Sequence, residues 1–499
     1  MMRLINDKKP ACRQAGNKGS ALAYALIIMA VVSIILVSLL QYISAQIKFS
    51  YSRGEKEEAF QIAESGIYFY RWYLAHSISG KTAQQIADFW NTGNPYGVNA
   101  PYEQDFYDPE GGVLGRYKIE VQPPNPNSTI VMVKATGWTY KEPNIKRVLQ
   151  VRFRRPSWSE FAVAANDVMR FGPGTEVYGK IFSNNGIRFD GLAHNIVSSA
   201  MDKYDDPDHN GDMEFGVHTH VDPPPGKNVS DSFVSAEAPP SPVQNRTDVF
   251  MAGRQFPVPA LDFNGVIADL GFMKAQSQIP GKGSYYDNSD CNNKTNLGRH
   301  IVLTGATMTV STVTDYNNAN DSITKEDCFL TNVPIINNGI IFVENNVWIE
   351  GIINGRRVSI VAANLLGGAK ANIYIGADNL LYTNFDGTDI IGLVSQNDIE
   401  VLKNSLDNLT IDAALLAQSG RVGRNNYTPF SCNSQSCQDH KGTITINGSM
   451  VTDLRYGFTF TNGTGYSNRV LNFDNNLLYF PPPYFPTGTE YSIDLWDEL

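Results

Sequence analysis

No residue from Ser20 to Ile47 is charged, and this stretch constrains the fold more than any other feature of the chain. Its central part reads SALAYALIIMAVVSIILVSLL. A helix rises about 1.5 Å per residue, so about 20 apolar residues cross the roughly 30 Å hydrocarbon core of a bilayer. We therefore expect one membrane-spanning helix here. The anchor residues that we expect to contact apolar surroundings include Ala21, Leu26, Ile27, Val31, Ile35 and Leu40.

The charges on the two sides of this stretch have opposite sign. Residues 1–19 contain five basic residues and one acidic residue, a formal charge of +4. Because the whole chain of 499 residues carries −10, the remainder carries −14. This asymmetry follows the positive-inside rule and predicts a single-pass membrane protein with an exported C-terminal body. An acidic body also argues against nucleic-acid binding, which needs clustered Lys and Arg.

The helical pattern continues past the apolar stretch, through EKEEAFQIAESGIYFYRWYL. Apolar residues recur there three or four positions apart and form one stripe, while the glutamates mostly occupy the other side. The members of the stripe are Ala59, Phe60, Ile62, Ala63, Ile67 and Tyr70. We expect one N-terminal helix over residues 20–76, with its first half in the membrane and its second half packed on a globular head.

The junction Lys18-Gly19-Ser20 and the segment AFQIAESGI together resemble the N-terminal part of PilX-type minor pilins, which are type IV pilin-like proteins. A secretory signal peptide has a shorter apolar region with its small-residue cleavage site after it, whereas here the small residue comes first. The resemblance covers residues 18–75. It implies that residues 1–19 are a leader cut between Gly19 and Ser20 by a prepilin peptidase. It also implies other pilin-like subunits and the pilus assembly platform as partners.

Two positions depart from the pattern of major pilins, which begin the mature chain with Phe and carry Glu at its fifth position. Ser20 and Tyr24 occupy these positions here. The departure implies a minor or accessory pilin at the cell surface or on a pilus, displaying its body for assembly or adhesion. The alternative is an ordinary signal-anchor helix that is never cut.

Residues 77–156 are predicted to form a small α/β head. QQIADFWNTG is a short amphipathic helix, and three later runs show the alternation of β-strands between turn residues. These runs are GRYKIEVQ, STIVMVKATGWTY and IKRVLQVRF. Packed on the second half of the long helix, they complete a pilin-like head that ends near Pro156.

Residues 157–499 are predicted to form a mainly β body. Short β runs recur, each ended by Gly or Asn, residues that tolerate a left-handed backbone. This pattern predicts the rungs of a right-handed parallel β-helix, with a β-sandwich as the alternative. Two interruptions are expected: an acidic, Pro-rich surface insertion at 201–247 and a helix near 262–276.

The cysteines divide between leader and body, with Cys12 in the leader. Removing the leader leaves an even number, as two disulfides in an exported protein require. From spacing we expect Cys291 to pair with Cys328 and Cys432 with Cys437. The alternative is four free thiols.

An acidic motif inside the insertion resembles the first half of a calcium loop, with oxygen ligands at alternate positions and Gly at the sixth. These ligands are Asp206, Asp208, Asn210 and Asp212. The twelfth position is Val217 where calcium binding needs Glu, so Ca²⁺ is a candidate cofactor only in a looser site, and the alternative is a solvated acidic loop. Close by, His218 and His220 have the spacing for a transition metal, with His209 or Asp222 as a third ligand.

No enzyme motif stands out: G-x-S-x-G, H-E-x-x-H and a phosphate-binding loop are all absent. We therefore expect a non-enzymatic protein. The alternative is a membrane-tethered β-helix outside any pilus that binds or cleaves surface glycans, with Asp386, Asp389 and Asp398 as candidate carboxylates.

Overall fold

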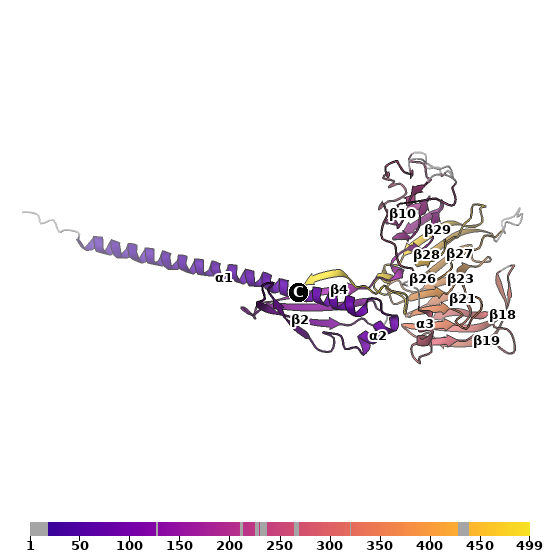
Figure 1. Ribbon diagram of the computed structural model, residues 1–499, viewed down its shortest axis with the longest axis horizontal. Helices are drawn as coiled ribbons and strands as arrows, with labels where there is room; N and C mark the ends of the chain where they lie inside the picture. The colour runs from indigo at the N-terminus through magenta and orange to yellow at the C-terminus, as the bar shows by residue number, and fades with distance from the viewer. Residues whose placement is uncertain are drawn as a thin grey trace, which may run out of the picture.

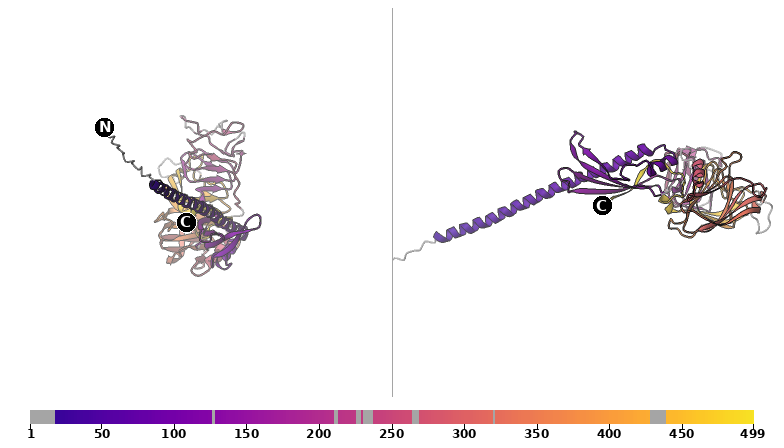
Figure 2. Two further views of the ribbon diagram at one scale, coloured as in Figure 1. Left: turned by 90° about the vertical axis from the view of Figure 1, so that its left-hand side faces the viewer. Right: turned by 90° about the horizontal axis from the view of Figure 1, so that it is seen from below.

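The chain forms a long helix, a small α/β head and a large β-rich body (Figure 1). This computed structural model describes residues 18–125, 128–209, 213–224, 229, 237–263, 269–319, 321–427 and 439–499. Helix α1 (Lys18–Ile78) is one helix of 61 residues. Figure 2 shows it as a rod that projects from the head, away from the body. Within the described ranges it is the one helix long and apolar enough to cross a membrane.

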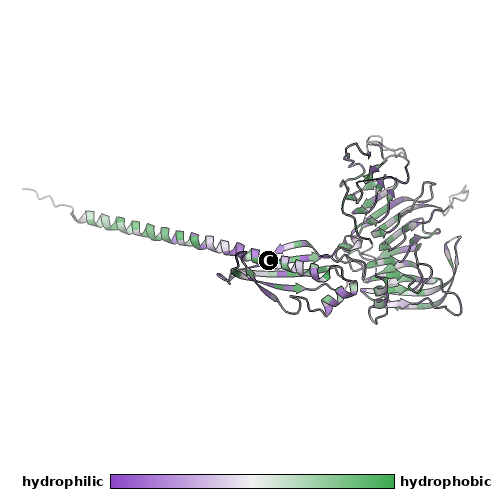
Figure 3. Ribbon diagram, viewed as in Figure 1, coloured by the Kyte–Doolittle hydropathy of each residue, from purple (hydrophilic) through white to green (hydrophobic). Residues whose placement is uncertain are grey.

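The two halves of α1 have different surroundings. Every side chain from Ser20 to Tyr51 is exposed. Most of this half is apolar and appears green in Figure 3. From Glu55 onward one face is buried against the head. The fully buried apolar residues of that face are Ala59, Ile62, Ala63, Ile67, Tyr70, Leu74 and Ile78. They follow the spacing of three and four that the sequence shows, while Phe60 is only partly buried.

The head is a five-stranded antiparallel sheet covered by α1 and by α2 (Ala83–Asn91). The strand order is β1 (Tyr102–Tyr107), β2 (Val113–Gln122), β3 (Ile130–Thr139), β4 (Lys146–Arg154) and β30 (Ser492–Glu498). Gly137 on β3 lets the helix lie directly on the sheet. A Cβ atom at Gly137 would lie 2.3 Å from the carbonyl oxygen of Ala59 and 2.4 Å from the nitrogen of Ala63.

Two of these strands lie outside the predicted set. β1 pairs with β2, and β30 pairs with β4 after a separation of more than 300 residues. The chain therefore passes between head and body twice, once near Pro156 and once before β30. The last strand of the range 157–499 belongs to the head sheet and not to the body. Where the two crossings meet, Ser157 bridges to Thr487, and the nitrogen of Gly488 donates to the carbonyl of Pro156 over 2.8 Å.

The body is built on one long ladder of parallel strands, joined by hydrogen bonds between neighbours. Its order in space is β16 (Gly283–Tyr286), β20 (Gly339–Val343), β22 (Arg357–Ala362), β24 (Ile390–Ser395), β26 (Asn408–Ala417), β28 (His440–Thr452), β5 (Val163–Ala165), β8 (Ile181–Ser183), β11 (Val197–Ser199) and β15 (Arg254–Gln255).

Further parallel ladders run beside the first. One comprises β17 (Gly298–Gly305), β21 (Asn346–Ile353), β23 (Ile373–Tyr382), β25 (Ile399–Val401) and β27 (Val422–Arg424). Another continues from β28 through β29 (Gly465–Phe473) and β7 (Thr175–Tyr178) to β10 (Leu192–Ala193). A third joins β6 (Met169–Phe171), β9 (Ile187–Phe189) and β14 (Val217–His218). Most of the apolar core lies between these ladders.

The order of strands in space differs from their order in the sequence. The chain enters at β5, in the interior of the ladder, and climbs to β15. It then crosses to the other end at β16 and returns strand by strand to β28, beside β5. In Figure 1 these two runs meet near the level of β28.

A hairpin arm leaves the body at β17. It consists of β18 (Thr307–Asn317) and β19 (Ser322–Pro334), which pair antiparallel with each other, while β18 also pairs with β17. The arm lies over the outer face of β21 and β23, where its residues Val313 and Tyr316 pack near Trp348.

The insertion at 201–247 differs from the predicted surface loop. Its described part contains the antiparallel pair β12 (Lys203–Tyr204) and β13 (Glu214–Phe215), and then β14, which extends the β6–β9 ladder. Glu214, His218 and His220 are completely buried. The helix expected near 262–276 is α3 (Leu270–Ser277), capped by Asp269, and residues 264–268 lie outside the described part.

Candidate functional sites

The anchor residues all lie on the half of α1 that has no packing partner among the described residues. Leu26, Ile27, Val31, Ile35 and Leu40 are each about half exposed or more, and Ala21 is exposed as well. The expected cleavage junction Gly19–Ser20 lies at the start of α1, beside Lys18. Residues 1–17 of the expected leader lie outside the described part.

One disulfide is present in the described residues, between Cys291 and Cys328. The Cα atoms are 6.3 Å apart, within the usual range for a disulfide. The bond ties the segment before β17 to β19 of the hairpin arm. Cys432 and Cys437 lie outside the described residues, so their expected pairing stays a prediction.

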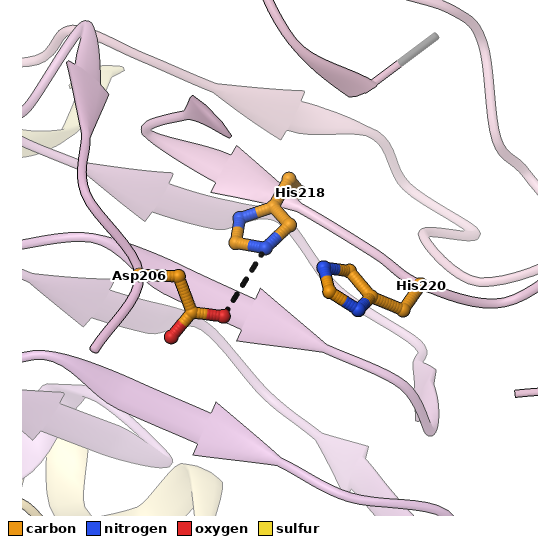
Figure 4. A group of neighbouring side chains, drawn as sticks. All are labelled: Asp206, His218 and His220. Atoms are coloured by element: carbon orange, nitrogen blue, oxygen red, sulfur yellow. Dashed lines mark ion pairs between the residues drawn. The ribbon is translucent and has the colours of Figure 1, made fainter. Parts of the chain in front are cut away.

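A cluster of buried side chains that could bind a metal lies in the insertion and is formed by Asp206, His218 and His220 (Figure 4). One ligand atom from each residue lies within 4.8 Å of the other two. Asp206 Oδ2 and His218 Nε2 are 3.6 Å apart. His218 is on β14 and His220 follows two residues later, while Asp206 follows β12. The spacing of the two histidines predicts a transition-metal site, whereas Asp206 was predicted as a calcium ligand.

Charged groups surround the cluster. Arg188 on β9 donates through Nε to Asp190 Oδ2 over 2.7 Å, and its Nη1 lies 3.9 Å from Asp206 Oδ2. Burial, together with Arg188 and His218, lowers the pKa of His220 to about 4. Burial raises the pKa of Asp206, but His218, the backbone of Asp208 and Arg188 outweigh it and lower the pKa to about 2. These shifts favour a neutral imidazole at His220 and an ionised carboxylate at Asp206, the forms that bind metals.

The calcium ligands expected beside this cluster do not converge within the described residues. The carboxylate of Asp208 pairs with Arg170 and Arg455, and the carboxylate of Asp206 faces His218. Asn210 and Asp212 lie outside the described part. A hard cation needs several oxygen ligands around one point, so the positions of Asp206 and Asp208 do not favour calcium.

A second candidate site is a cavity of about 260 Å³ between the hairpin arm and the β21–β23 face. Residues at matching ladder positions point toward it: His300, Trp348 and Tyr374 are successive partners on β17, β21 and β23. The rings of Trp348 and Tyr374 stack with centroids 5.0 Å apart. Trp348 is nearly buried, so Tyr374 offers more of its ring to a ligand.

Acidic groups gather at the same cavity. His300 Nδ1 lies 2.7 Å from Glu326 Oε1, and its Nε2 lies 3.5 Å from Glu350. Burial lowers the pKa of His300, but these two carboxylates outweigh it and raise the pKa above its usual value. Asp321 also lines the cavity, and Glu400 continues the ladder from Tyr374. Sequence reasoning missed this site, although Trp348, Tyr374 and Glu400 follow one another at a fixed interval of 26 residues.

The carboxylates proposed for catalysis hold turns together. Asp389 accepts from the nitrogens of Thr383 and Asn384 over 3.0 and 2.7 Å. Asp386 accepts from Thr388, and Asp398 Oδ1 accepts from the nitrogen of Arg421 over 2.8 Å. These bonds give the three carboxylates structural roles in the turns between strands.

Comparison with known proteins supports the pilin-like N-terminal segment. Residues 18–67 match the family model described as PilX N-terminal. The N-terminal segment is therefore type IV pilin-like, which confirms the resemblance inferred from AFQIAESGI and its surroundings.

The solved structures that resemble this chain include the competence-associated pilin ComZ from Thermus thermophilus, with 14% sequence identity and a TM-score of 0.29. The match covers 89% of this chain and 98% of that chain, but a TM-score of 0.29 is too low to establish a shared fold. No curated protein matches the chain.

Proposed function

We propose that this protein is a non-enzymatic minor or accessory type IV pilin-like protein of the cell surface. Helix α1 holds it in the membrane or among other pilin-like subunits, and the head carries the β-rich body outward for pilus assembly or adhesion. The observation that carries this proposal is the division of α1 into an exposed apolar half and a half buried on the head.

The exposed half supports an apolar partner outside the chain. Side chains such as Leu26 and Ile35 are exposed around the whole helix and not along one stripe. Each Leu, Ile or Val at the centre of a membrane helix favours insertion by about 0.3–0.6 kcal/mol. Lipid before assembly, and the helices of other pilin-like subunits after it, provide such surroundings.

Processing between Gly19 and Ser20 is part of the proposal. Both residues fall within the matched segment, and Gly19 stands on the basic side of the apolar stretch. Tyr24 in place of the expected Glu favours a minor or accessory role. The partners are then a prepilin peptidase, the assembly platform and other pilin-like subunits.

We further propose that the body is a right-handed parallel β-helix. The parallel ladders support this, and so does a ladder of side chains at one turn. Asn346 Oδ1 accepts from the nitrogen of Asn372, and Asn372 Oδ1 accepts from the nitrogen of Asp398, over 2.9 and 3.0 Å. Stacked amides of this kind align one rung on the next. In domain terms, residues 77–156 and β30 form the head, and the intervening chain forms the body.

Mass spectrometry of the N-terminus tests the proposed processing. The full chain is co-expressed with a prepilin peptidase, and we expect a mature chain that begins at Ser20. Gly19→Val blocks the cut. Gly54→Ala, in an open part of α1, is the matched control and leaves the cut intact. If a peptidase that processes another pilin leaves this chain whole, the proposal is wrong.

The cavity under the hairpin arm favours glycan binding as a second candidate function. Tyr374 supplies a ring face, and Asp321, Glu326 and Glu350 supply acceptors that suit hydroxyl or ammonium groups of a sugar. Intrinsic fluorescence titration with chitosan oligosaccharides, and with cellohexaose as a neutral probe, tests this function. We expect saturable quenching that Tyr374→Ala abolishes and that Tyr140→Ala, on the head, leaves intact. Equal responses of the two variants and the unmodified chain would contradict it.

A further inference from the structure

We propose that Asp206, His218 and His220 bind a divalent transition metal ion, with Zn²⁺ the expected ion, and that this ion fastens the insertion to the body. The proposal goes beyond the pilin-like function and does not depend on it. It rests on the geometry, the burial and the charge of the cluster.

The geometry fits a metal better than a hydrogen bond. Asp206 Oδ2 and His218 Nε2 are 3.6 Å apart, beyond the usual length of a hydrogen bond. Two ligands bound to zinc at about 2.0–2.1 Å in a tetrahedral site lie about 3.3 Å apart, which is close to the observed separation. All three ligand atoms already lie within 4.8 Å of one another, so a small contraction closes the site.

Burial gives the second, independent observation. His218 has no exposed surface, and neither of its ring nitrogens has a hydrogen-bond partner in the described residues. Asp206 Oδ2 has no hydrogen-bond partner there either. Native proteins pair almost all buried polar atoms, because an unpaired one loses its bonds to water. A metal ion between them satisfies His218 Nε2 and Asp206 Oδ2 together.

The charge of the surroundings favours a dication. Four almost fully buried ionisable side chains lie around the histidines: Asp190, Asp206, Glu214 and Arg188. With the histidines neutral, as metal binding requires, three carboxylates against one guanidinium leave a formal charge of −2, which one divalent ion neutralises. The guanidinium of Arg188 donates to Asp190, and this bond holds it beside the cluster.

The donor types select the class of metal. Two imidazole nitrogens and one carboxylate oxygen suit Zn²⁺ and its transition-metal neighbours, whereas Ca²⁺ and Mg²⁺ need oxygen ligands. A carboxylate also supports a neighbouring histidine, since His209 Nδ1 lies 3.0 Å from Glu214 Oε1 and its ring lies edge-on to His220. The ion links β14 to the turn that holds Asp206, segments that are otherwise joined through short strands.

The test measures metal bound to the full chain in detergent. The protein is stripped with a chelator, incubated with Zn²⁺, desalted and analysed by mass spectrometry of the metal. We expect about one Zn²⁺ per chain, and at least a tenfold loss for His218→Ala and for Asp206→Asn. His76→Ala, an exposed histidine on α1, is the matched control and keeps full occupancy.

Cobalt substitution supplies a readout that folding alone does not move. Co²⁺ in the unmodified chain should give the visible absorption of a four-coordinate site, and Asp206→Asn should shift or remove this absorption while far-UV circular dichroism stays unchanged. A chain that binds neither ion above the level of the His218→Ala variant overturns the proposal. So does a His76→Ala variant that loses zinc to the same extent.

Discussion

The head and the body bury different kinds of side chain. The head buries an apolar face of α1 against one sheet, and among its described Asp, Glu, Lys and Arg residues Glu55 is the one that is buried. The body also has a large apolar core, but it encloses charged residues as well, among them Arg188, Arg424 and Glu237. A buried charge is costly unless it is paired, so removing one partner harms the fold more than removing an exposed pair.

This difference indicates how each unit is specified. In the head, shape and apolar area determine how the helix lies on the sheet. In the body, buried pairs such as Arg188 with Asp190, two residues apart at β9, are stable only while both partners are present, because removing one leaves the other charge alone. The following four predictions test this contrast, in order of decreasing effect. Hydrogen exchange resolved by mass spectrometry reports the two units separately.

Arg188→Leu should have the largest effect. The change leaves Asp190 buried without its charged partner, and breaking a buried pair costs about 3–5 kcal/mol in the free energy of unfolding. We expect faster exchange in peptides of β6, β9 and β14 and no change in the head. Arg116→Leu, which removes an exposed pair with Glu103 and Asp105, should have a much smaller effect, because water screens exposed charges. Equal effects of the two variants would contradict the contrast.

Ile62→Ala should weaken the head by removing the centre of the buried face of α1. Ile62 is completely buried, and a change of this kind costs about 2–4 kcal/mol. Exchange should rise in β2, β3 and β4 and stay unchanged in the body. Leu26→Ala, in the exposed half of the same helix, should leave the exchange of the head unaltered. A comparable loss from Leu26→Ala would show that the exposed half also packs on the head.

Gly137→Ala tests how closely α1 lies on the sheet. The added Cβ meets backbone atoms of Ala59 and Ala63, which cannot rotate away, so we expect a loss of about 1–3 kcal/mol. Gly112→Ala, where the added atom meets nothing within 4 Å, is the control and should leave the unfolding temperature of the head unchanged. An unchanged unfolding temperature for Gly137→Ala would mean that the helix stands farther from β3.

The smallest effect concerns the pH dependence of the body. Burial and the neighbouring Asp321 raise the pKa of Glu400 from 4.5 to about 7. The folded protein therefore holds this proton more tightly than the unfolded chain does. The resulting stabilisation is complete below pH 4.5 and is lost as the pH rises toward 7. Since Glu400 is only partly buried, we expect a loss of about 1 kcal/mol.

Urea unfolding at pH 5 and pH 8 measures this loss. Glu400→Gln should reduce the difference between the two pH values, since the amide does not titrate and the raised pKa of His300 accounts for part of the remainder. Glu103→Gln, on the exposed surface of the head, is the control and should preserve it. If Glu400→Gln unfolds with the same pH dependence as the unmodified chain, another group is responsible.

Local patterns in the sequence predict local structure well. The stripe from Ala59 to Tyr70 gave the buried face of α1, because helical spacing depends only on near neighbours. The pairing of β30 with β4 could not be predicted in this way, since the two strands are more than 300 residues apart. Nothing in the sequence of either strand identifies its partner. The position of β5 between β28 and β8 could not be predicted for the same reason, since β28 lies far from β5 in the sequence.

Only part of each candidate site could be predicted, because spacing reveals residues that are close in the sequence and not residues that the fold brings together. His218 and His220 are two residues apart, so their shared face follows from strand geometry. Asp206 joins them only because β12 and β13 pair across the motif that resembles a calcium loop. At the cavity, the interval of 26 residues between Trp348, Tyr374 and Glu400 was a usable signal, but irregular spacing elsewhere in the body obscured it.

The double crossing between head and body has a mechanical consequence. Both connections end in paired neighbouring strands, with Arg154 of β4 opposite Ser492 of β30. Tension between an anchored α1 and a body attached to a surface therefore pulls on two strands in the same direction. The β3–β4 ladder resists this pull in shear, so its hydrogen bonds share the force and do not open one at a time. Because the two chain segments that enter the body both come from the head sheet, stretching the molecule does not pull the parallel strands of the body apart from one end.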